Sequence, residues 1–309
     1  LSLVEELCEL LELSADSVYR RIRGEKPITL HELKKISEHY HISVDQLLQL
    51  QTESVLFQAP GMNGVVGEHI DYMKAMLGQF KYFNSFKGRQ IHYLCKDAPF
   101  WYFYLYPEMA AFKTFFWSKT INNHPGLINK QFSLEEYPFT ECYELGQTIL
   151  EEHNQMESVE LWNLESIHSS INQVAYYKDA GIFRSQSDCE AVVDSFIKML
   201  DHLQLQAEKG FKFMPGATDI AHRGPIQFYV NELILGNNTI LLGLDGKRIS
   251  MITYSVLNYL ITRDDRFASK AFETFNTLLS RSSLISRAGE KDRNRFFNSL
   301  RDKVNAVRK

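Results

Sequence analysis

Basic side chains concentrate in one short segment near the N-terminus of this 309-residue chain. The candidate contact residues of this segment are Asp16, Ser17, Tyr19, Arg20, Arg21, Arg23 and Lys26. A guanidinium group can donate two hydrogen bonds at once, either to the acceptor edge of guanine or to a phosphate. We therefore predict contacts to nucleic acid, with Arg20 at base edges and Arg23 and Lys26 at backbone phosphates.

The other members of the segment have less specific chemistry. Ser17 and Tyr19 are expected as flanking contacts, and Arg21 lies beside them. Asp16 has two interpretations, because a carboxylate can accept from cytosine or can favour the positive end of a helix dipole.

A run of short helices has to present these side chains. Ser2 begins an S-x-x-E capping box that opens a helix over 3–11, and Ser14 caps a second helix over 15–23 that stops at Gly24. Further polar starts at Thr29 and Ser43 open two more helices, the first with Leu30, Leu33 and Ile36 facing inward.

Helical periodicity assigns two faces to the second helix. At 100° per residue, Ala15, Val18 and Ile22 share the apolar face, so the arginines and Asp16 are expected on the opposite face. A short helix with an outward basic face is suited to the major groove of a duplex.

The stretch over 3–48 resembles the Cro/C1-type (lambda-repressor-like, XRE) helix-turn-helix family. The matching features are the LxxL run, the Ser14 cap, the arginine-rich helix that ends in Gly24-Glu25-Lys26, and the ISVDQLL ending. The resemblance implies a first motif helix over 3–11, a recognition helix over 15–23, and a domain over 1–50 truncated at its N-terminus, because the family has one more helix before these.

Two features depart from the family pattern. Glu12 occupies a turn where the family often has glycine, and residues 1–52 carry nine acidic and six basic side chains, a net charge of −3. Phosphate neutralisation drives non-specific DNA affinity, so this acidity favours an alternative. In that alternative, the chain is a protein-interaction or ligand-sensing protein whose head no longer binds DNA.

The rest of the chain predicts a glycine-containing linker over 51–67 and an α+β regulatory or dimerisation domain over 68–309. Strands are expected over 90–95 and 100–106, and a three-stranded antiparallel meander over 226–233, 239–244 and 248–254. The expected helices cover 69–86, 107–119, 139–153, 164–180, 187–208, 265–280 and 290–307. The predicted fold class is mainly α, a helix-turn-helix bundle followed by an antiparallel sheet covered by helices.

Composition and motifs restrict the function. A hydrophobic content of 44% is typical of a globular protein, and no catalytic or metal-binding motif occurs, so we expect no enzyme activity, cofactor or metal. Four widely spaced cysteines and no secretory signal favour the cytoplasm, without membrane insertion. The expected function is a DNA-binding transcriptional regulator that binds double-stranded DNA as a homodimer and responds to a small-molecule or peptide effector.

The C-terminal segment is also basic. Residues 281–309 contain nine Lys or Arg side chains and three acidic ones. They could lie along DNA phosphates or form a solvated helix face.

Overall fold

The computed structural model describes residues 2–40, 42–48, 54–59, 69–217, 223–233, 236–255 and 258–308. The chain divides into two compact units, 1–56 and 57–309, and each is described by itself. Of the predicted linker over 51–67, the glycine-containing stretch 61–67 lies outside the described residues.

The described residues of the first unit form four helices, as the pattern of polar caps predicts. They are α1 (Leu3–Leu11), α2 (Ala15–Ile22), α3 (Leu30–Tyr40) and α4 (Val44–Leu47). Ser2 and Glu5 form the reciprocal capping box, and the Ser14 hydroxyl accepts from the Ser17 N–H at 3.4 Å. Thr29 and Glu32 cap the start of α3 in the same reciprocal way. Side chains therefore satisfy N–H groups that the starts of these helices leave unpaired.

The backbone conformation of the turn between α1 and α2 is one that glycine adopts more readily than other residues. Glu12 has φ 57° and ψ 42°, which is the left-handed conformation that a side chain disfavours. Gly24 has φ +74° just beyond α2, where its lack of a side chain removes that cost.

The core of this unit is smaller than the helical periodicity suggests. Val18 is buried at 1% exposure, but Ile22 is 54% exposed and Leu30 is 86% exposed. The prediction that Ile22, Ala15 and Leu30 face inward is therefore wrong. A helix of only eight residues in a small unit can bury a narrow stripe, so periodicity overstates the buried face.

The second unit is built on one mixed sheet of seven strands in the order β6-β5-β4-β1-β2-β3-β7. The strands are β1 (Arg89–Leu94), β2 (Glu157–Trp162), β3 (Ile226–Val230), β4 (Thr239–Leu244), β5 (Lys247–Thr253), β6 (Tyr259–Thr262) and β7 (Ser283–Leu284). Strands β1, β2 and β3 are parallel, and the other pairs are antiparallel. His92 of β1 lies opposite Val159 of β2 and Leu241 of β4.

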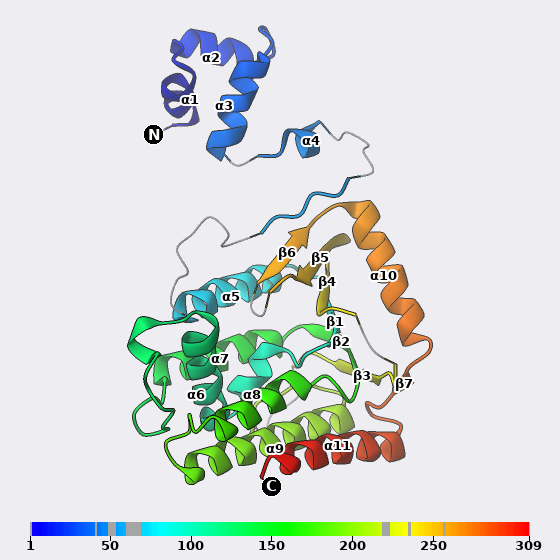
Figure 1. The fold of residues 1–309 in the computed structure, drawn as a ribbon. Helices are drawn as coiled ribbons and strands as arrows, with labels where there is room; N and C mark the ends of the chain where they lie inside the picture. The colour runs from blue at the N-terminus through cyan, green and yellow to red at the C-terminus, as the bar shows by residue number, and fades with distance from the viewer. Residues whose placement is uncertain are drawn as a thin grey trace. The chain divides into compact units, whose positions relative to one another are not determined.

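Helices cover the two faces of this sheet unequally (Figure 1). The helices are α5 (His69–Asn84), α6 (Pro107–Phe116), α7 (Thr140–His153), α8 (His168–Asp179), α9 (Gln186–Lys209), α10 (Asp265–Leu279) and α11 (Glu290–Asn305). Ile91 and Tyr93 of β1 join the main core with most of these helices. Leu94 faces the other way and packs with Phe275 of α10, the helix that covers the opposite face.

Two strand predictions in this unit are wrong. Residues predicted as a strand over 100–106 form a 3-10 helix, Phe100–Tyr104, in which all five aromatic side chains are buried. A continuous apolar run has no period that separates a strand from a helix. The predicted meander is also wrong, because β3 pairs with β2 and β7, whereas the antiparallel meander is β4-β5-β6.

The broader predictions of the fold are confirmed. The chain is mainly α with α+β character, although its sheet is mixed rather than antiparallel. Asp245 and Gly246 form the β4–β5 hairpin turn with positive φ values of 46° and 83°, as the Asp-Gly pair predicts. Within the described residues, we find no helix both long and apolar enough to cross a membrane.

Candidate functional site

The outward face of α2 carries most of the predicted contact residues. Asp16, Tyr19 and Arg20 are exposed on this helix, and Arg23 and Lys26 are exposed just after its end. Ser17 is half-buried, and its hydroxyl accepts a hydrogen bond from the Ser14 hydroxyl at 3.1 Å. Ser17 therefore contributes to the start of the helix as well as to its surface.

Glu25 contacts both outward arginines. Its carboxylate lies 3.0 Å from Arg23 Nε and 3.7 Å from Arg20 Nε, and all three side chains are about half exposed. Ion pairs exposed to water contribute only about 0–1 kcal/mol, so a phosphate group can displace the carboxylate. Glu25 also adds negative charge at the place where a nucleic acid would approach.

Arg21 differs from the other predicted residues, because its side chain points into the unit. Its Nε and Nη2 donate to Glu32 at 3.1 and 2.6 Å, and its Nη1 donates to the Ser17 carbonyl at 3.0 Å. Only 6% of the Arg21 side chain is exposed. Arg21 thus fixes α2 against α3.

The partner of Arg21 is strongly stabilised in its charged form. Hydrogen bonds from Arg21 and from the Thr29 N–H lower the pKa of Glu32 from 4.5 to about 2. The Glu32 side chain is 13% exposed, so water screens this pair only in part. The arrangement gives α2 a fixed orientation, which a surface that reads base edges requires.

The exposed basic surface of α2 agrees with a match to a known family of domains. Residues 3–79 match the BetR domain. The BetR domain is a DNA-binding domain of the helix-turn-helix type, and the match spans α1 to α4 and part of α5. It covers about a quarter of the chain, and it assigns a DNA-binding regulatory role to this part.

The finer resemblance to the Cro/C1 type stays a prediction, because the BetR match is to a helix-turn-helix domain without that subdivision. The BetR segment ends at residue 79, whereas the first compact unit ends at Leu56. No curated protein and no solved structure matches the chain.

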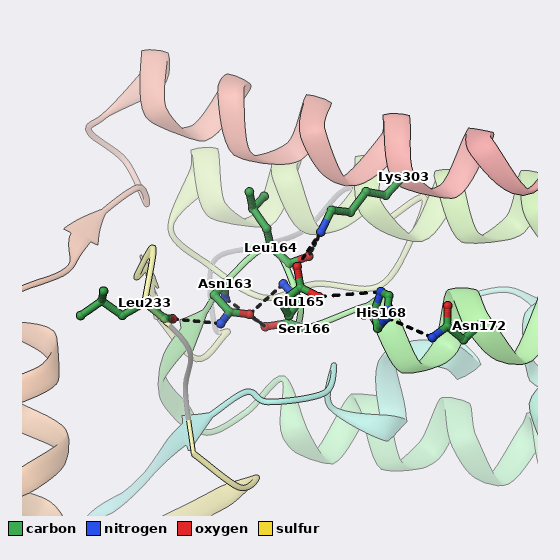
Figure 2. Close-up of polar contacts among 8 residues, drawn as sticks. All are labelled: Asn163, Leu164, Glu165, Ser166, His168, Asn172, Leu233 and Lys303. Atoms are coloured by element: carbon green, nitrogen blue, oxygen red, sulfur yellow. Dashed lines mark hydrogen bonds and ion pairs between the residues drawn. The ribbon is translucent and has the colours of Figure 1, made fainter.

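The carboxyl ends of β1, β2 and β3 form a second candidate site, because parallel sheets bind ligands at this edge. Figure 2 shows the loop that follows β2. Asn163 Nδ2 donates to the Leu233 carbonyl at 3.1 Å, and its Oδ1 accepts from the Glu165 N–H at 2.8 Å. Lys303 Nζ of α11 donates to the Leu164 carbonyl at 2.9 Å and to Glu165 at 2.8 Å. These groups are occupied in binding the loop to the segment that follows β3 and to α11.

Two hollows flank this loop, with volumes of about 740 and 870 Å³. Asp97 and Gln173 line the first hollow, and burial raises the pKa of Asp97. Lys113 lies beneath it and donates to Ser170 and Gln173, each at 2.7 Å. Burial lowers the pKa of Lys113 to about 7. Among the described lining residues, Gln173 and Glu165 are engaged with Lys113 and Lys303.

The basic C-terminal segment is largely used within the second unit. Arg293 is buried and donates to the carbonyls of Ile285 and Ala288 at 2.9 and 3.1 Å. Other cations of α11 pair with acids, among them Arg295 with Glu232. The helix therefore resembles a partnered protein surface more than a phosphate-binding stripe.

Proposed function

We propose that this chain is a DNA-binding transcriptional regulator in which α2 enters the major groove of double-stranded DNA. In this proposal the second unit has no enzymatic role and serves as a sensory or dimerisation domain. The observation that carries the proposal is the outward face of α2, with Arg20, Arg23 and Tyr19 exposed in a segment that matches the BetR domain. The Cro/C1 subdivision and a cytoplasmic location are part of the same proposal.

The dimensions of α2 fit this role. An α-helix with its side chains is about 10–12 Å across, which matches the major-groove width of about 12 Å, and at about 1.5 Å per residue the eight residues of α2 are about 12 Å long. In the proposed complex Arg20 reads base edges, and Arg23 and Lys26 bind phosphates. Arg21 acts as a positioning residue through its contact with Glu32. Because helix-turn-helix proteins commonly read paired half-sites, the proposed complex contains a homodimer.

Selection from a random DNA library, followed by salt titration of the full chain on the selected duplex, tests the proposal. Arg20→Ala should relax base preference at one position of each half-site. Arg23→Ala and Lys26→Ala should weaken binding to all sequences and reduce the salt slope by about one each.

Lys34→Ala is the matched control, because Lys34 is a similarly exposed cation on the neighbouring helix α3. It should leave base preference and salt slope unchanged. The proposal fails if the three α2-region variants retain wild-type affinity and selectivity, or if the control variant changes base preference as Arg20→Ala does.

A second candidate function is a head that binds another protein instead of DNA. The net charge of −3 over residues 1–52 and the exposed Ile22 and Leu30 favour it. The same salt titration separates the two, because phosphate-driven binding weakens steeply with salt and binding through apolar surface does not.

A further inference from the structure

The hollow beside the ends of β1 and β2, about 740 Å³ in volume, has the size of a small-molecule site. Such sites have volumes of about 300–1,000 Å³. The walls of this hollow, the Asp97 hollow, are the loop after β1, the end of α6 and the turn that follows it, the loop after β2, and one face of α8. The α8 residues that line it recur at helical spacing and are His168, Ser169, Asn172, Gln173 and Tyr176.

The carboxylate of Asp97 is half-buried at this hollow and has no hydrogen-bond or ion-pair partner among the described residues. The backbone beside it is held in place on two sides. The Asp97 N–H donates to Asn238 Oδ1 at 2.9 Å, and the Ala98 N–H donates to the Ser166 carbonyl at 2.6 Å. A charged group that has lost water without gaining a partner is costly, so a cationic ligand atom would relieve this cost.

The cations near Asp97 do not neutralise it. Lys96 lines the hollow but is exposed, and within the described part of the chain it forms no ion pair with Asp97. Lys113 lies beneath the hollow, where burial lowers its pKa to about 7, so its amine is charged only in part near pH 7. Burial raises the pKa of Asp97 and outweighs the opposing effect of these lysines and of His168.

His168 and Asn172 of α8 leave one acceptor at the hollow (Figure 2). His168 Nδ1 lies 3.7 Å from Glu165 Oε2, and His168 Nε2 lies 3.0 Å from Asn172 Nδ2. When Nδ1 carries the proton, the ring is neutral and Nε2 accepts from the Asn172 amide. The Asn172 Oδ1 then has no partner among the described residues.

Two aromatic side chains supply the apolar part of the lining. Phe116, at the end of α6, is 7% exposed, and Tyr176 of α8 is 59% exposed. An aromatic ring offers apolar surface to a ligand, and its face attracts a positive charge. The Asp97 hollow thus combines one carboxylate without a partner, one amide acceptor and two rings.

We propose that the Asp97 hollow binds a primary amine with an apolar body. The ammonium group donates to the Asp97 carboxylate and to Asn172 Oδ1, and the apolar body packs against Phe116 and Tyr176. An amine fits the hollow better than an acid does, because the half-buried Asp97 gains more from a counter-charge than the exposed Lys96.

The role of this amine as an effector rests on the proposed function, whereas its binding does not. In the regulator, the amine would shift DNA affinity only if it binds the DNA-competent and incompetent states with different affinities.

Isothermal titration calorimetry of the full chain at pH 7 tests the binding. The probes are phenethylamine and hexylamine, with 2-phenylethanol and hexan-1-ol as uncharged counterparts and phenylacetate as an anionic one. We expect saturable binding of at least one amine, and binding of its alcohol and of phenylacetate at least tenfold weaker. The proposal is overturned if neither amine binds saturably, or if the alcohols or phenylacetate bind as tightly as the amines.

Two variants with matched controls locate the site. Asp97→Asn keeps the size of the side chain and removes its charge, whereas Asn172→Trp fills the hollow from an exposed position of α8. Each should weaken amine binding at least tenfold. The controls Asp179→Asn, at the exposed end of α8, and Thr274→Trp, on the exposed surface of α10, should bind as the wild type does.

Wild-type affinity in Asp97→Asn overturns the proposal. Should that variant fail to fold, Asn172→Trp carries the test, and wild-type affinity in it shows that the amine binds elsewhere. An equal loss of affinity in the controls would likewise contradict the assignment to this hollow.

Fluorescence anisotropy with the selected duplex separates the two proposals. A shift in DNA affinity at saturating amine, absent in Asn172→Trp, supports an effector role. Amine binding without any shift leaves the binding site in place and rules out its effector role. Absence of DNA binding by the protein alone rules out the proposed function and not the site.

Discussion

The half-buried ion pair between Arg21 and Glu32 leads to a quantitative prediction about the first unit. Glu32→Gln keeps the size of the side chain and an acceptor for the Thr29 N–H, but removes the negative charge that Arg21 contacts at 2.6 Å. Breaking a buried pair leaves the guanidinium without its counter-charge. We therefore expect local opening of α2 and α3 to become easier.

The magnitude follows from the pKa of Glu32. A fall from 4.5 to about 2 corresponds to about 3.4 kcal/mol, at about 1.36 kcal/mol per pKa unit. Solvent screening at the partly exposed edge of a small unit reduces this, and we expect a loss of about 1–2 kcal/mol at pH 7. The wild-type advantage should be complete above pH 4.5 and should disappear as the pH falls through about 2, because the folded-state pKa lies below the unfolded one.

Hydrogen exchange followed by mass spectrometry on the full chain measures this loss. In Glu32→Gln, protection of peptides from α2 and α3 should fall about fivefold to thirtyfold at pH 7. Glu38→Gln is the control, because Glu38 also lies on α3 but forms an exposed pair with Lys34 at 3.7 Å. Equal protection in both variants would refute the assignment of Arg21 as a positioning residue.

Three further substitutions, one of them with a control variant, test the surface and the core. Glu25→Gln removes the carboxylate beside Arg20 and Arg23, and it should raise DNA affinity about twofold to fivefold in an anisotropy titration. An unchanged affinity would contradict the inference that Glu25 opposes DNA binding. Lys113→Met should raise the free energy of unfolding in urea most strongly below pH 7, and this gain should shrink as the pH rises toward 10.5. The reason is that burial depresses the folded-state pKa of the Lys113 amine to about 7. A difference that does not depend on pH would argue against that depressed pKa. Gly146→Ala should lose about 1–3 kcal/mol of stability and lower the Tm, since its Cβ would lie 2.3 Å from the Tyr104 ring. Gly78→Ala, at an exposed position of α5, is its control and should gain about 0.4–1 kcal/mol. A similar Tm in both variants would count against a close approach at Gly146.

Local chemistry made the first unit largely predictable. The Ser2, Ser14 and Thr29 caps each mark a helix start within a residue, because a cap and its N–H partner are close in sequence. The inward turn of Arg21 was not predictable in this way. Its partner Glu32 is eleven residues away, and helical periodicity alone does not identify such a contact.

In the second unit, sequence patterns predict local turns but not the pairing of strands. The Asp245-Gly246 turn was readable, since two adjacent residues determine it. Strand pairing was not, because β1 joins β2 and β4 through contacts more than sixty residues apart in sequence. The hollow that His69, Thr114 and Thr140 line could not be predicted from the sequence either, since its lining comes from three helices and the loops between them.

The edge strands β6 and β7 of the seven-strand sheet limit how two copies of the chain could associate. At one edge, the Gln58 N–H donates to the Ile261 carbonyl at 2.7 Å and the Ile261 N–H donates back to the Gln58 carbonyl at 2.8 Å, so another segment of the chain already pairs with β6 at Ile261. At the other rim, β7 is two residues long. Adding a strand from outside needs a long row of free backbone groups. A homodimer formed through this unit would therefore have to join helical surfaces, and a β-strand peptide would be a poor inhibitor of its assembly.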